Sequence, residues 1–284
     1  MSRIAYVSGR YLPQSVASVS IEDRGYQFAD GVYEVMAVHR GKLLDRELHL
    51  KRLERSLAEL RIAKPVEDRV LRTILERVVK LNKVANGIVY LQITRGVAPR
   101  DHAFPLVARP QLVVTARRAK PADPKLMETG VSVISIPDER WARRDIKSIS
   151  LLPNVLGKQI AREARAYEAW QVDAEGLVTE GTSSNAWIVT GEGAIVTRPA
   201  GPVILNGITR LVVIDFAREA GLDFVDRAFS LAEAKAAPEA FLTSTTSLVT
   251  PVTRIDGAAI GDGKPGPVTR QLRARILQHL ESLA

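Results

Sequence analysis

The chain has 284 residues, 46% of them hydrophobic and 25% charged, which is the composition of an ordinary globular protein of one large or two modest domains. It has no cysteine, which excludes disulfides and thiolate metal sites, and no run of eighteen apolar residues, so no membrane span is expected. The net charge of +8 comes from Lys and Arg that alternate with Asp and Glu without a basic tract, which disfavours nucleic-acid binding and favours solvated faces that attract anionic metabolites.

The first 119 residues predict an α+β domain of strands, two helices and further strands. Strands are expected around the turn Ser8-Gly9 and before the turn at Gly41. Leucines at helical spacing from Leu48 predict one amphipathic helix, and Pro65 precedes a second. The expected strands are Ile4–Val7, Arg10–Pro13 and residues 32–38, 88–94 and 111–115, and the expected helices are residues 47–61 and 66–78.

Residues 120–126 are the expected linker. Pro121 and Pro124 lie close together there, which excludes a helix and favours an extended connector. Residues 127–284 then predict a second, C-terminal domain. Its expected strands are residues 131–136 and a hairpin of 186–189 with 194–196, and its expected helices are residues 154–169, 208–220 and 268–283.

Lys147 is the first candidate for chemistry. It follows Arg143 and Arg144, and cationic neighbours together with partial desolvation favour the neutral form of a lysine amine. The neutral amine attacks a carbonyl to form a Schiff base, and once released it can act as a general base and acid. The alternative interpretation is a surface lysine without a role.

Glu180 is the second candidate. Turn formers and hydroxyl residues follow it as Gly181-Thr182-Ser183-Ser184-Asn185, which predicts a loop. A carboxylate that faces a pyridine nitrogen keeps the ring protonated and makes it an electron sink, and the hydroxyls of Thr182 and Ser183 would donate to the same cofactor or to the substrate. An ordinary loop carboxylate is the alternative.

Two segments predict a phosphate site. Gly207 allows close backbone approach to an anion, and Ile208 and Thr209 present N–H groups at a helix N-terminus, where the dipole favours a phosphate. Ser244 and Thr245 follow a strand with a buried pattern and offer hydroxyls as further ligands. The alternatives are a capped helix and a polar turn.

Arg52 and a short loop complete the set. Arg52, on the first amphipathic helix, is predicted to reach inward and bind a phosphate through two hydrogen bonds, with a solvated arginine as the alternative. Arg100 and His102 stand two residues apart in a loop, and with Tyr33 they are predicted to hold a substrate carboxylate. The histidines lack metal-ligand spacing, so no metal site is expected.

An amine, a carboxylate, phosphate ligands and a carboxylate trap together indicate an enzyme that moves amino groups with pyridoxal 5′-phosphate (PLP). The whole chain resembles the class IV, or fold type IV, PLP-dependent aminotransferases. The resemblance is carried, in the family's order, by the Arg-Gly-Tyr-Gln-Phe-Ala-Asp-Gly-Val-Tyr-Glu block at 24–34, Lys147-Ser148, the Glu-Gly-Thr-Ser-Ser-Asn block at 180–185 and Gly-Ile-Thr-Arg at 207–210. Thr182 stands where serine is common, and Pro153-Asn154 replaces smaller residues; neither removes a catalytic group.

The resemblance implies an α+β or α/β fold of two domains, a small N-terminal one and a larger C-terminal one with a β-barrel-like sheet that carries the Schiff-base lysine, and a cofactor at the domain interface. It implies a Schiff base at Lys147 and pairing of the pyridine nitrogen with Glu180. It assigns further cofactor contacts to Arg52, Ser183, Leu205, Gly207, Ile208, Thr209, Ser244 and Thr245. It assigns the substrate carboxylate to Tyr33, Arg100 and His102, with the loop reaching over from the neighbouring subunit of a homodimer.

Within the family, Arg-x-His together with Tyr33 is the pattern of members that act on D-amino acids. The resemblance therefore implies transamination between a D-alanine-like donor and a 2-oxoglutarate-like acceptor, in the cytoplasm, since no signal peptide is recognised. The alternatives on the same fold are a branched-chain L-amino acid transaminase, an (R)-amine transaminase and a 4-amino-4-deoxychorismate lyase. A further alternative is a basic binding protein without catalysis, against which the presence of both Lys147 and Glu180 argues.

Overall fold

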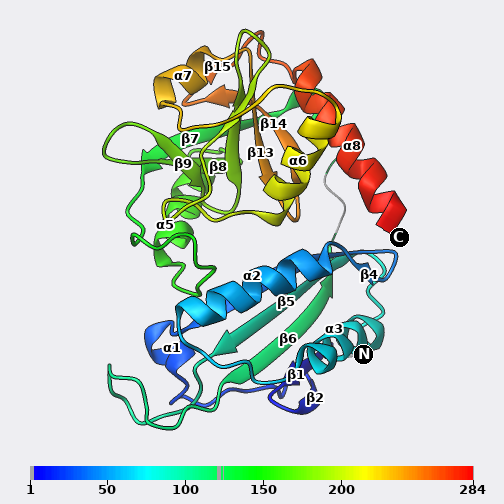
Figure 1. The fold of residues 1–284 in the computed structure, drawn as a ribbon, viewed down its shortest axis with the longest axis vertical. Helices are drawn as coiled ribbons and strands as arrows, with labels where there is room; N and C mark the ends of the chain where they lie inside the picture. Colours follow the sequence, from blue (N-terminus) through cyan, green and yellow to red (C-terminus); the bar gives the residue numbers. More distant parts are fainter. Residues whose placement is uncertain (1–2, 120–122, 124, 284) are drawn as a thin grey trace. The chain divides into compact units, whose positions relative to one another are not determined.

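The chain folds into two compact units in the computed structural model, which describes residues 3–119, 123 and 125–283 (Figure 1). Unit 1 holds the described residues before position 122, the segment Ile146–Ser150 and Leu283, and unit 2 holds the described residues from 123 to 145 and Leu151–Ser282. The two-domain α+β fold expected from the sequence is confirmed. Of the linker expected at 120–126, residues 120–122 and 124 lie outside the described residues, and residues 125 and 126 begin helix α4 (Lys125–Thr129).

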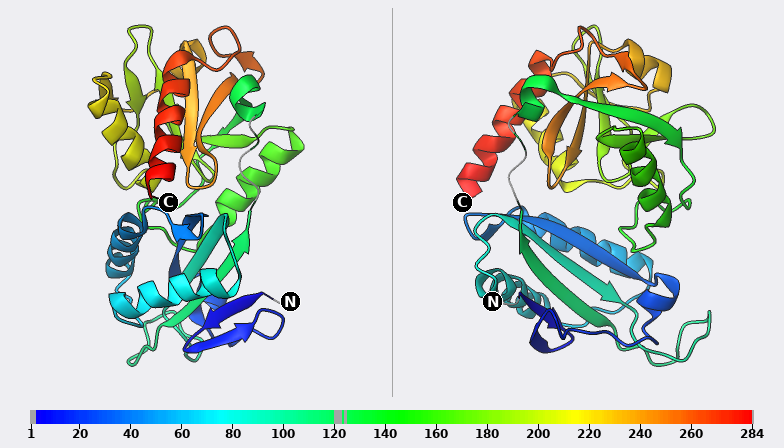
Figure 2. Two further views of the ribbon diagram at one scale, coloured as in Figure 1. Left: turned by 90° about the vertical axis from the view of Figure 1, so that its right-hand side faces the viewer. Right: turned by 180° about the vertical axis from the view of Figure 1, so that it is seen from behind.

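Unit 1 is built on an antiparallel six-stranded sheet in the order β2-β1-β6-β5-β3-β4. Apolar side chains alternate along its long strands, so one face is apolar, and α2 and α3 cover that face (Figure 2). In α3 the apolar positions follow the 3.6-residue period, at Leu71, Ile74, Leu75 and Val78. The elements are β1 (Ile4–Val7), β2 (Arg10–Pro13), α1 (Arg24–Phe28), β3 (Gly31–His39), β4 (Lys42–Leu43), α2 (Arg46–Glu59), α3 (Asp68–Leu81), β5 (Gly87–Thr94) and β6 (Gln111–Arg118).

Unit 2 is built on a mixed sheet in the order β12-β11-β10-β13-β14-β7-β8-β9, with β15 beside β14. The sheet curls so that its last strand, β9, contacts β10, which agrees with the barrel-like sheet that was expected. Hydrophobic clusters fill both of its faces, one around Trp170 and one around Trp187. The elements after α4 are β7 (Val131–Pro137), α5 (Leu152–Glu163), β8 (Glu168–Val172), β9 (Val178–Gly181), β10 (Asn185–Val189), β11 (Ile195–Thr197), α6 (Ile208–Glu219), β12 (Phe224–Asp226), α7 (Leu231–Ala236), β13 (Glu239–Ser244), β14 (Leu248–Ile255), β15 (Ala258–Ala259) and α8 (Pro267–Leu283).

No helix among the residues that the structure describes combines the length and apolarity needed to cross a membrane. The helix expected at 154–169 is shorter than expected, because α5 ends at Glu163. Arg165 has a φ of +57°, a left-handed conformation that stops the helix. Residues 168–172 then form β8 with Trp170 fully buried, so burial in the sheet overrides their helical pattern.

The segment Ile146–Ser150 belongs to unit 1, although its neighbours in sequence belong to unit 2. The sequence analysis had placed Lys147 in the C-terminal domain. The segment runs beside the start of β3: the Tyr33 N–H donates to the Lys147 carbonyl at 3.0 Å, and the Ile149 N–H donates to the Gly31 carbonyl at 3.1 Å. Ile146 is buried in the core of unit 1, so the segment is fixed there by hydrogen bonds and by packing.

Candidate active site

Lys147 and Tyr33 lie side by side in unit 1. Lys147 Nζ is 4.2 Å from the centroid of the Tyr33 ring, and the Lys147 main-chain N–H donates to Ser56 Oγ at 3.3 Å. Lys147 is half-buried. The structure thus brings together the predicted amine and the predicted phenol, more than one hundred residues apart in sequence.

Arg52 forms a two-point pair with Glu34. Arg52 Nε and Nη2 each lie 2.7 Å from a Glu34 oxygen, and His49 Nδ1 lies 2.7 Å from Glu34 Oε2. Burial raises the pKa of Glu34, but Arg52 and His49 outweigh burial and lower its pKa to about 2. Burial lowers the pKa of His49 against the pull of Glu34. Arg52 is therefore an inward-facing cation held by a carboxylate to which sequence analysis had assigned no role.

Arg100 and His102 lie on the aromatic ring of Phe28 in α1. The Arg100 guanidinium is 4.6 Å from the Phe28 ring centroid, and the centroids of the His102 and Phe28 rings are 5.3 Å apart. Tyr33 instead stacks on Tyr90, with ring centroids 5.7 Å apart. Arg100 and His102 are thus brought to one place, and within the described residues of unit 1 no hydrogen bond or ring contact joins either of them to Tyr33.

Glu180 is buried in unit 2, near the end of β9. Both of its oxygens accept the Leu205 N–H, at 3.2 and 3.1 Å, and Arg140 forms an ion pair with it. Arg140 is shared with Asp138, at 2.8 Å. Burial raises the pKa of Glu180, and the attraction of Arg140 and the Leu205 N–H oppose that rise. Arg140 was missed by sequence analysis, because nothing local separates it from the other arginines that precede Lys147.

The hydroxyls after Glu180 are turned towards a second buried carboxylate, Glu168. Ser183 Oγ donates to Glu168 Oε2 at 2.9 Å, Ser184 Oγ donates to the same oxygen at 3.2 Å, and Thr182 Oγ1 donates to Oε1. Sequence analysis had expected the hydroxyls of Thr182 and Ser183 to face a cofactor or substrate. Glu168 fixes the turn that follows Glu180, a role that the sequence conceals because Glu168 lies within β8.

Asn185 links Glu180 to the segment that leads into α6. Its Nδ2 donates to Glu180 Oε2 at 3.1 Å and to the Leu205 carbonyl at 2.9 Å. Helix α6 then begins at Ile208 with Gly207 as its N-cap residue, and Gly207 supplies no side-chain cap. The first N–H groups of such a helix suit an anion.

The turn between β13 and β14 carries the second set of predicted phosphate ligands. Ser244 Oγ lies 2.7 Å from Ser247 Oγ and accepts the Ser247 N–H at 3.1 Å. Buried Arg273 of α8 donates to the Ser247 carbonyl at 2.9 Å, and this hydrogen bond stabilises the turn. Thr245 is half-buried in the same turn.

The predicted cofactor residues of unit 2 gather at one end of its sheet. Asn185, the first residue of β10, pairs with Thr243. Strand β13 ends one residue later at Ser244, and the turn with Thr245 follows directly. The Asn185 side chain contacts both Glu180 and Leu205. Asn185 thus connects Glu180 to the segment before α6 and lies beside the end of β13, where Ser244 and Thr245 follow.

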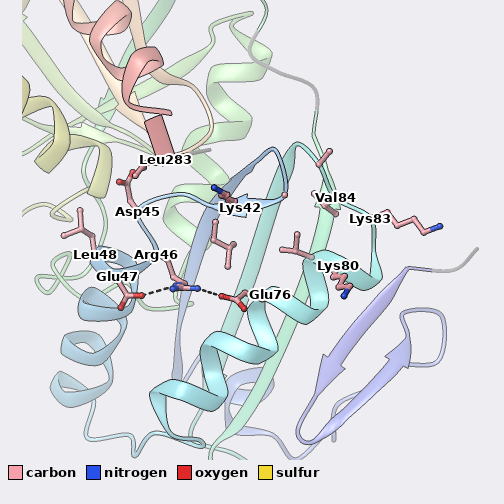
Figure 3. Close-up of a pocket in the computed structure, with 14 residues that line it drawn as sticks. Lys42, Asp45, Arg46, Glu47, Leu48, Glu76, Lys80, Lys83, Val84 and Leu283 are labelled. Carbon is pink, nitrogen blue, oxygen red and sulfur yellow. Dashed lines mark hydrogen bonds and ion pairs between the residues drawn. The ribbon is translucent and has the colours of Figure 1, made fainter. Parts of the chain in front are cut away.

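A surface pocket of about 1070 Å³ in unit 1 lies elsewhere (Figure 3). Arg46 bridges Glu47 at 3.0 Å and Glu76 at 2.5 Å at its edge. Its lining includes the exposed lysines Lys42, Lys80 and Lys83. None of the candidate catalytic, cofactor-binding or substrate-binding residues from the sequence lines this pocket, so its size does not make it a candidate for the active site.

Comparison with known proteins identifies the family. The model of the family "Amino-transferase class IV" matches residues 31–255. A D-alanine aminotransferase of Bacillus licheniformis is 44% identical over 270 residues, which cover 95% of this chain and 94% of that protein. A D-alanine aminotransferase of Staphylococcus haemolyticus is 40% identical, with 98% of each chain covered.

The fold agrees with that family. A solved structure of a branched-chain amino acid aminotransferase with pyridoxamine 5′-phosphate matches with a TM-score of 0.92 and 24% identity, over 100% of this chain and 96% of that one. The structure of 4-amino-4-deoxychorismate lyase from Pseudomonas aeruginosa matches with a TM-score of 0.81 and 26% identity, over 96% of this chain and 98% of that one. The chain therefore belongs to the class IV aminotransferases, and its cofactor is pyridoxal 5′-phosphate.

Proposed function

We propose that this chain is a D-amino acid aminotransferase, which exchanges an amino group between a D-alanine-like donor and a 2-oxoglutarate-like acceptor. The observation that carries the proposal is the identity of 44% to a D-alanine aminotransferase over nearly the whole of both chains. The sequence pattern of Arg100, His102 and Tyr33 agrees with it. The branched-chain and lyase relatives share the fold at much lower identity.

The residues of unit 2 fit the phosphate and the ring of PLP. A Cβ on Gly207 would come within 2.2 Å of Asn185 Oδ1, so this glycine is required for the close backbone at the start of α6. Because Gly207 has no side chain to cap the helix, the N–H groups of Ile208 and Thr209 are available to a phosphate. Ser244 and Thr245 are the further proposed ligands. Leu205 would pack against the ring, and Ser183, whose Oγ donates to Glu168, would complete the cofactor contacts of this unit with the acceptor side of its hydroxyl.

PLP, when bound, supplies an aldehyde for an amine and a protonated ring that accepts electrons from the substrate Cα. Lys147 Nζ would hold the cofactor aldehyde as a Schiff base, and the freed amine would take the proton from the substrate Cα and return a proton. Glu180 would face the ring nitrogen and keep it protonated. Arg52, held by Glu34, adds its positive charge to the phosphate contacts.

Tyr33, Arg100 and His102 bind the substrate carboxylate in this proposal. Arg100 and His102 lie on Phe28, and no hydrogen bond or ring contact joins them to Tyr33 within the described part of the chain, which agrees with a trap assembled from two copies. In that arrangement the loop of one subunit serves Tyr33 of its neighbour in a homodimer. The exposed loop residues Leu106 and Val107 are the apolar surface expected of a segment that meets another chain.

The proposed location is the cytoplasm, since a chain without cysteine has no need of an oxidising compartment. Cell fractionation with an antibody tests this. Sedimentation of the purified protein, with and without PLP, tests the homodimer.

Donor specificity tests the central claim. The purified protein with PLP is given D-alanine or L-leucine together with 2-oxoglutarate, and the 2-oxo acid products are measured. We expect turnover with D-alanine and at least a hundredfold lower rate with L-leucine. Turnover with L-leucine alone, or release of pyruvate from 4-amino-4-deoxychorismate without an acceptor, would replace the proposal with one of the other activities.

A further inference from the structure

The exposed loop that carries Arg100 and His102 is held by a buried arginine. Arg24, 3% exposed, donates through Nη1 to the Asp101 carbonyl at 2.5 Å and to the Ala103 carbonyl at 3.2 Å. Its Nη2 donates to the His102 carbonyl at 3.3 Å. Three successive carbonyls of an otherwise exposed segment thus point to one guanidinium.

Arg24 is itself fixed in place by Asp30. Arg24 Nε donates to Asp30 Oδ2 at 2.8 Å, and Arg95 makes a two-point pair with the same carboxylate at 2.7 and 2.9 Å. Burial raises the pKa of Asp30, and the two guanidinium groups outweigh burial, so its pKa lies below the usual range. Asp30 is therefore ionised at neutral pH and keeps Arg24 aimed at the loop.

The base of the loop is closed as well. The Arg24 N–H donates to the Gly96 carbonyl at 2.9 Å, and the Ala98 N–H donates to the Glu22 carbonyl at 3.3 Å. Gly96 has a φ of +102°, and a Cβ there would come within 2.0 Å of the Arg109 carbonyl oxygen. The ends of the loop are thus brought together by backbone that only glycine can adopt.

The same arginine supports the aromatic ring on which the two proposed substrate residues lie. The Arg24 guanidinium is 4.9 Å from the Phe28 ring centroid, and the Arg100 guanidinium is 4.6 Å from the same centroid. The His102 ring lies 5.3 Å from it. Arg24 therefore fixes the main chain of the loop and also contacts the surface against which its side chains rest.

We propose that Arg24 is a positioning residue for the substrate carboxylate, which acts by holding the loop so that Arg100 and His102 are oriented before the substrate arrives. The inference rests on the proposed function, because it requires that these two residues bind the carboxylate. An exposed loop of this length loses conformational freedom when it orders around a ligand, and a loop that is already ordered avoids that cost. The planar guanidinium offers five N–H donors in a fixed fork, and a lysine ammonium does not reproduce that fork.

Arg24→Lys tests the proposal, because lysine keeps the positive charge beside Asp30 and loses the fork. We expect faster hydrogen exchange of the amides at 100–104 and at least a tenfold rise in KM for D-alanine, with kcat changed less than threefold. The same substitution in an Arg100→Ala variant completes a double-mutant cycle. If Arg24 acts only through the loop, Arg24→Lys should raise KM little further once Arg100 is absent. Arg77→Lys, at an exposed arginine that stacks on Tyr11 in the same unit, is the matched control and should change none of these readouts.

The outcomes separate the inference from the proposed function. Unchanged hydrogen exchange of the amides at 100–104 in Arg24→Lys overturns the inference, whatever the activity of the variant. If Arg24→Lys raises KM for D-alanine tenfold in the Arg100→Ala background as well as in wild type, the inference is also overturned. The effect of Arg24 on KM would then not depend on Arg100. If Arg100→Ala leaves KM for D-alanine unchanged, the proposed carboxylate trap is wrong, while faster exchange in Arg24→Lys still shows that Arg24 orders the loop.

Discussion

Glu34 receives two hydrogen bonds from Arg52, each 2.7 Å long, and both side chains are turned away from solvent. Glu34 is fully buried, and His49 Nδ1 reaches the same carboxylate. A buried carboxylate that gains such partners is stable only in its charged form. The proposed phosphate contact of Arg52 is thus linked to the protonation of Glu34.

Glu34→Gln should change how stability depends on pH. The folded pKa of Glu34 is about 2, against an ordinary 4.5, so its contribution is complete above pH 4.5 and is lost as pH falls towards 2. The pKa of His49 is also lowered on folding, so it too makes the folded state less stable as the pH falls below about 6.5. We expect Glu34→Gln to cost about 3 kcal/mol at pH 7 and to flatten the loss of stability between pH 4.5 and 2.

Urea unfolding at a series of pH values measures both effects. Glu54→Gln, on the exposed side of α2, is the control and should change stability by less than about 0.5 kcal/mol. An acid limb of equal slope in wild type and Glu34→Gln would contradict the prediction.

Gly207→Ala should weaken cofactor binding. The new Cβ would come within 2.2 Å of Asn185 Oδ1, and Asn185 would have to move away from Glu180 and Leu205. We expect a cost of about 1–3 kcal/mol in stability and at least a tenfold rise in the Kd for PLP, measured by absorbance titration. Gly201→Ala is the matched control, because no atom lies within 4 Å of its Cβ position. If Gly207→Ala and Gly201→Ala bind PLP with equal Kd, the proposed role of Gly207 in cofactor binding is wrong.

Lys147→Ala should abolish covalent retention of the cofactor. Borohydride reduction followed by mass spectrometry should find the cofactor on a peptide with Lys147 in wild type and on no peptide in the variant. Loss of a positioned acid and base costs about 10²–10⁴-fold in rate, so turnover should fall at least that far. Lys80→Ala, at an exposed lysine of the surface pocket in Figure 3, should retain both cofactor and activity.

Glu168→Gln should loosen the turn that follows Glu180. The amide accepts fewer hydrogen bonds than the carboxylate, which serves Thr182, Ser183 and Ser184. We expect stability to fall by about 1–3 kcal/mol and kcat to fall, because the turn that holds those hydroxyls directly follows Glu180. Calorimetry and steady-state kinetics measure the two effects, and Glu175→Gln, an exposed glutamate, is the control. Unchanged stability would show that Glu168 does not hold the turn.

Sequence reasoning succeeded where the signal is local. The spacing of apolar residues in α3 and the alternation along β3 identified the elements that form the core of unit 1. Glu180, Gly207 and Thr245 belong to three separate motifs, and the structure brings those motifs to one end of the unit 2 sheet. Each motif has its own turn or helix start, which short-range chemistry specifies.

The residues that were missed act over long separations in sequence. Arg24 holds carbonyls 77–79 residues away, and Glu168 receives hydroxyls 14–16 residues away, so neither partner set is visible in a local window. The early end of α5 depends on the left-handed backbone at Arg165 and on burial of Trp170 in β8. Tertiary burial there outweighs helical propensity.

Five residues, Ile146–Ser150, return the chain to unit 1 after unit 2 has begun, so neither unit is one uninterrupted stretch of sequence. A chimaera that joins the first 119 residues of this chain to the remainder of a relative would pair Gly31 and Tyr33 with a foreign strip of backbone. The immediate neighbours of Lys147, the proposed Schiff-base residue, would then come from two parents. Recombination that respects the fold has to graft this pentapeptide together with the N-terminal part, and a library built that way should keep a larger share of active members than one spliced only at the expected linker.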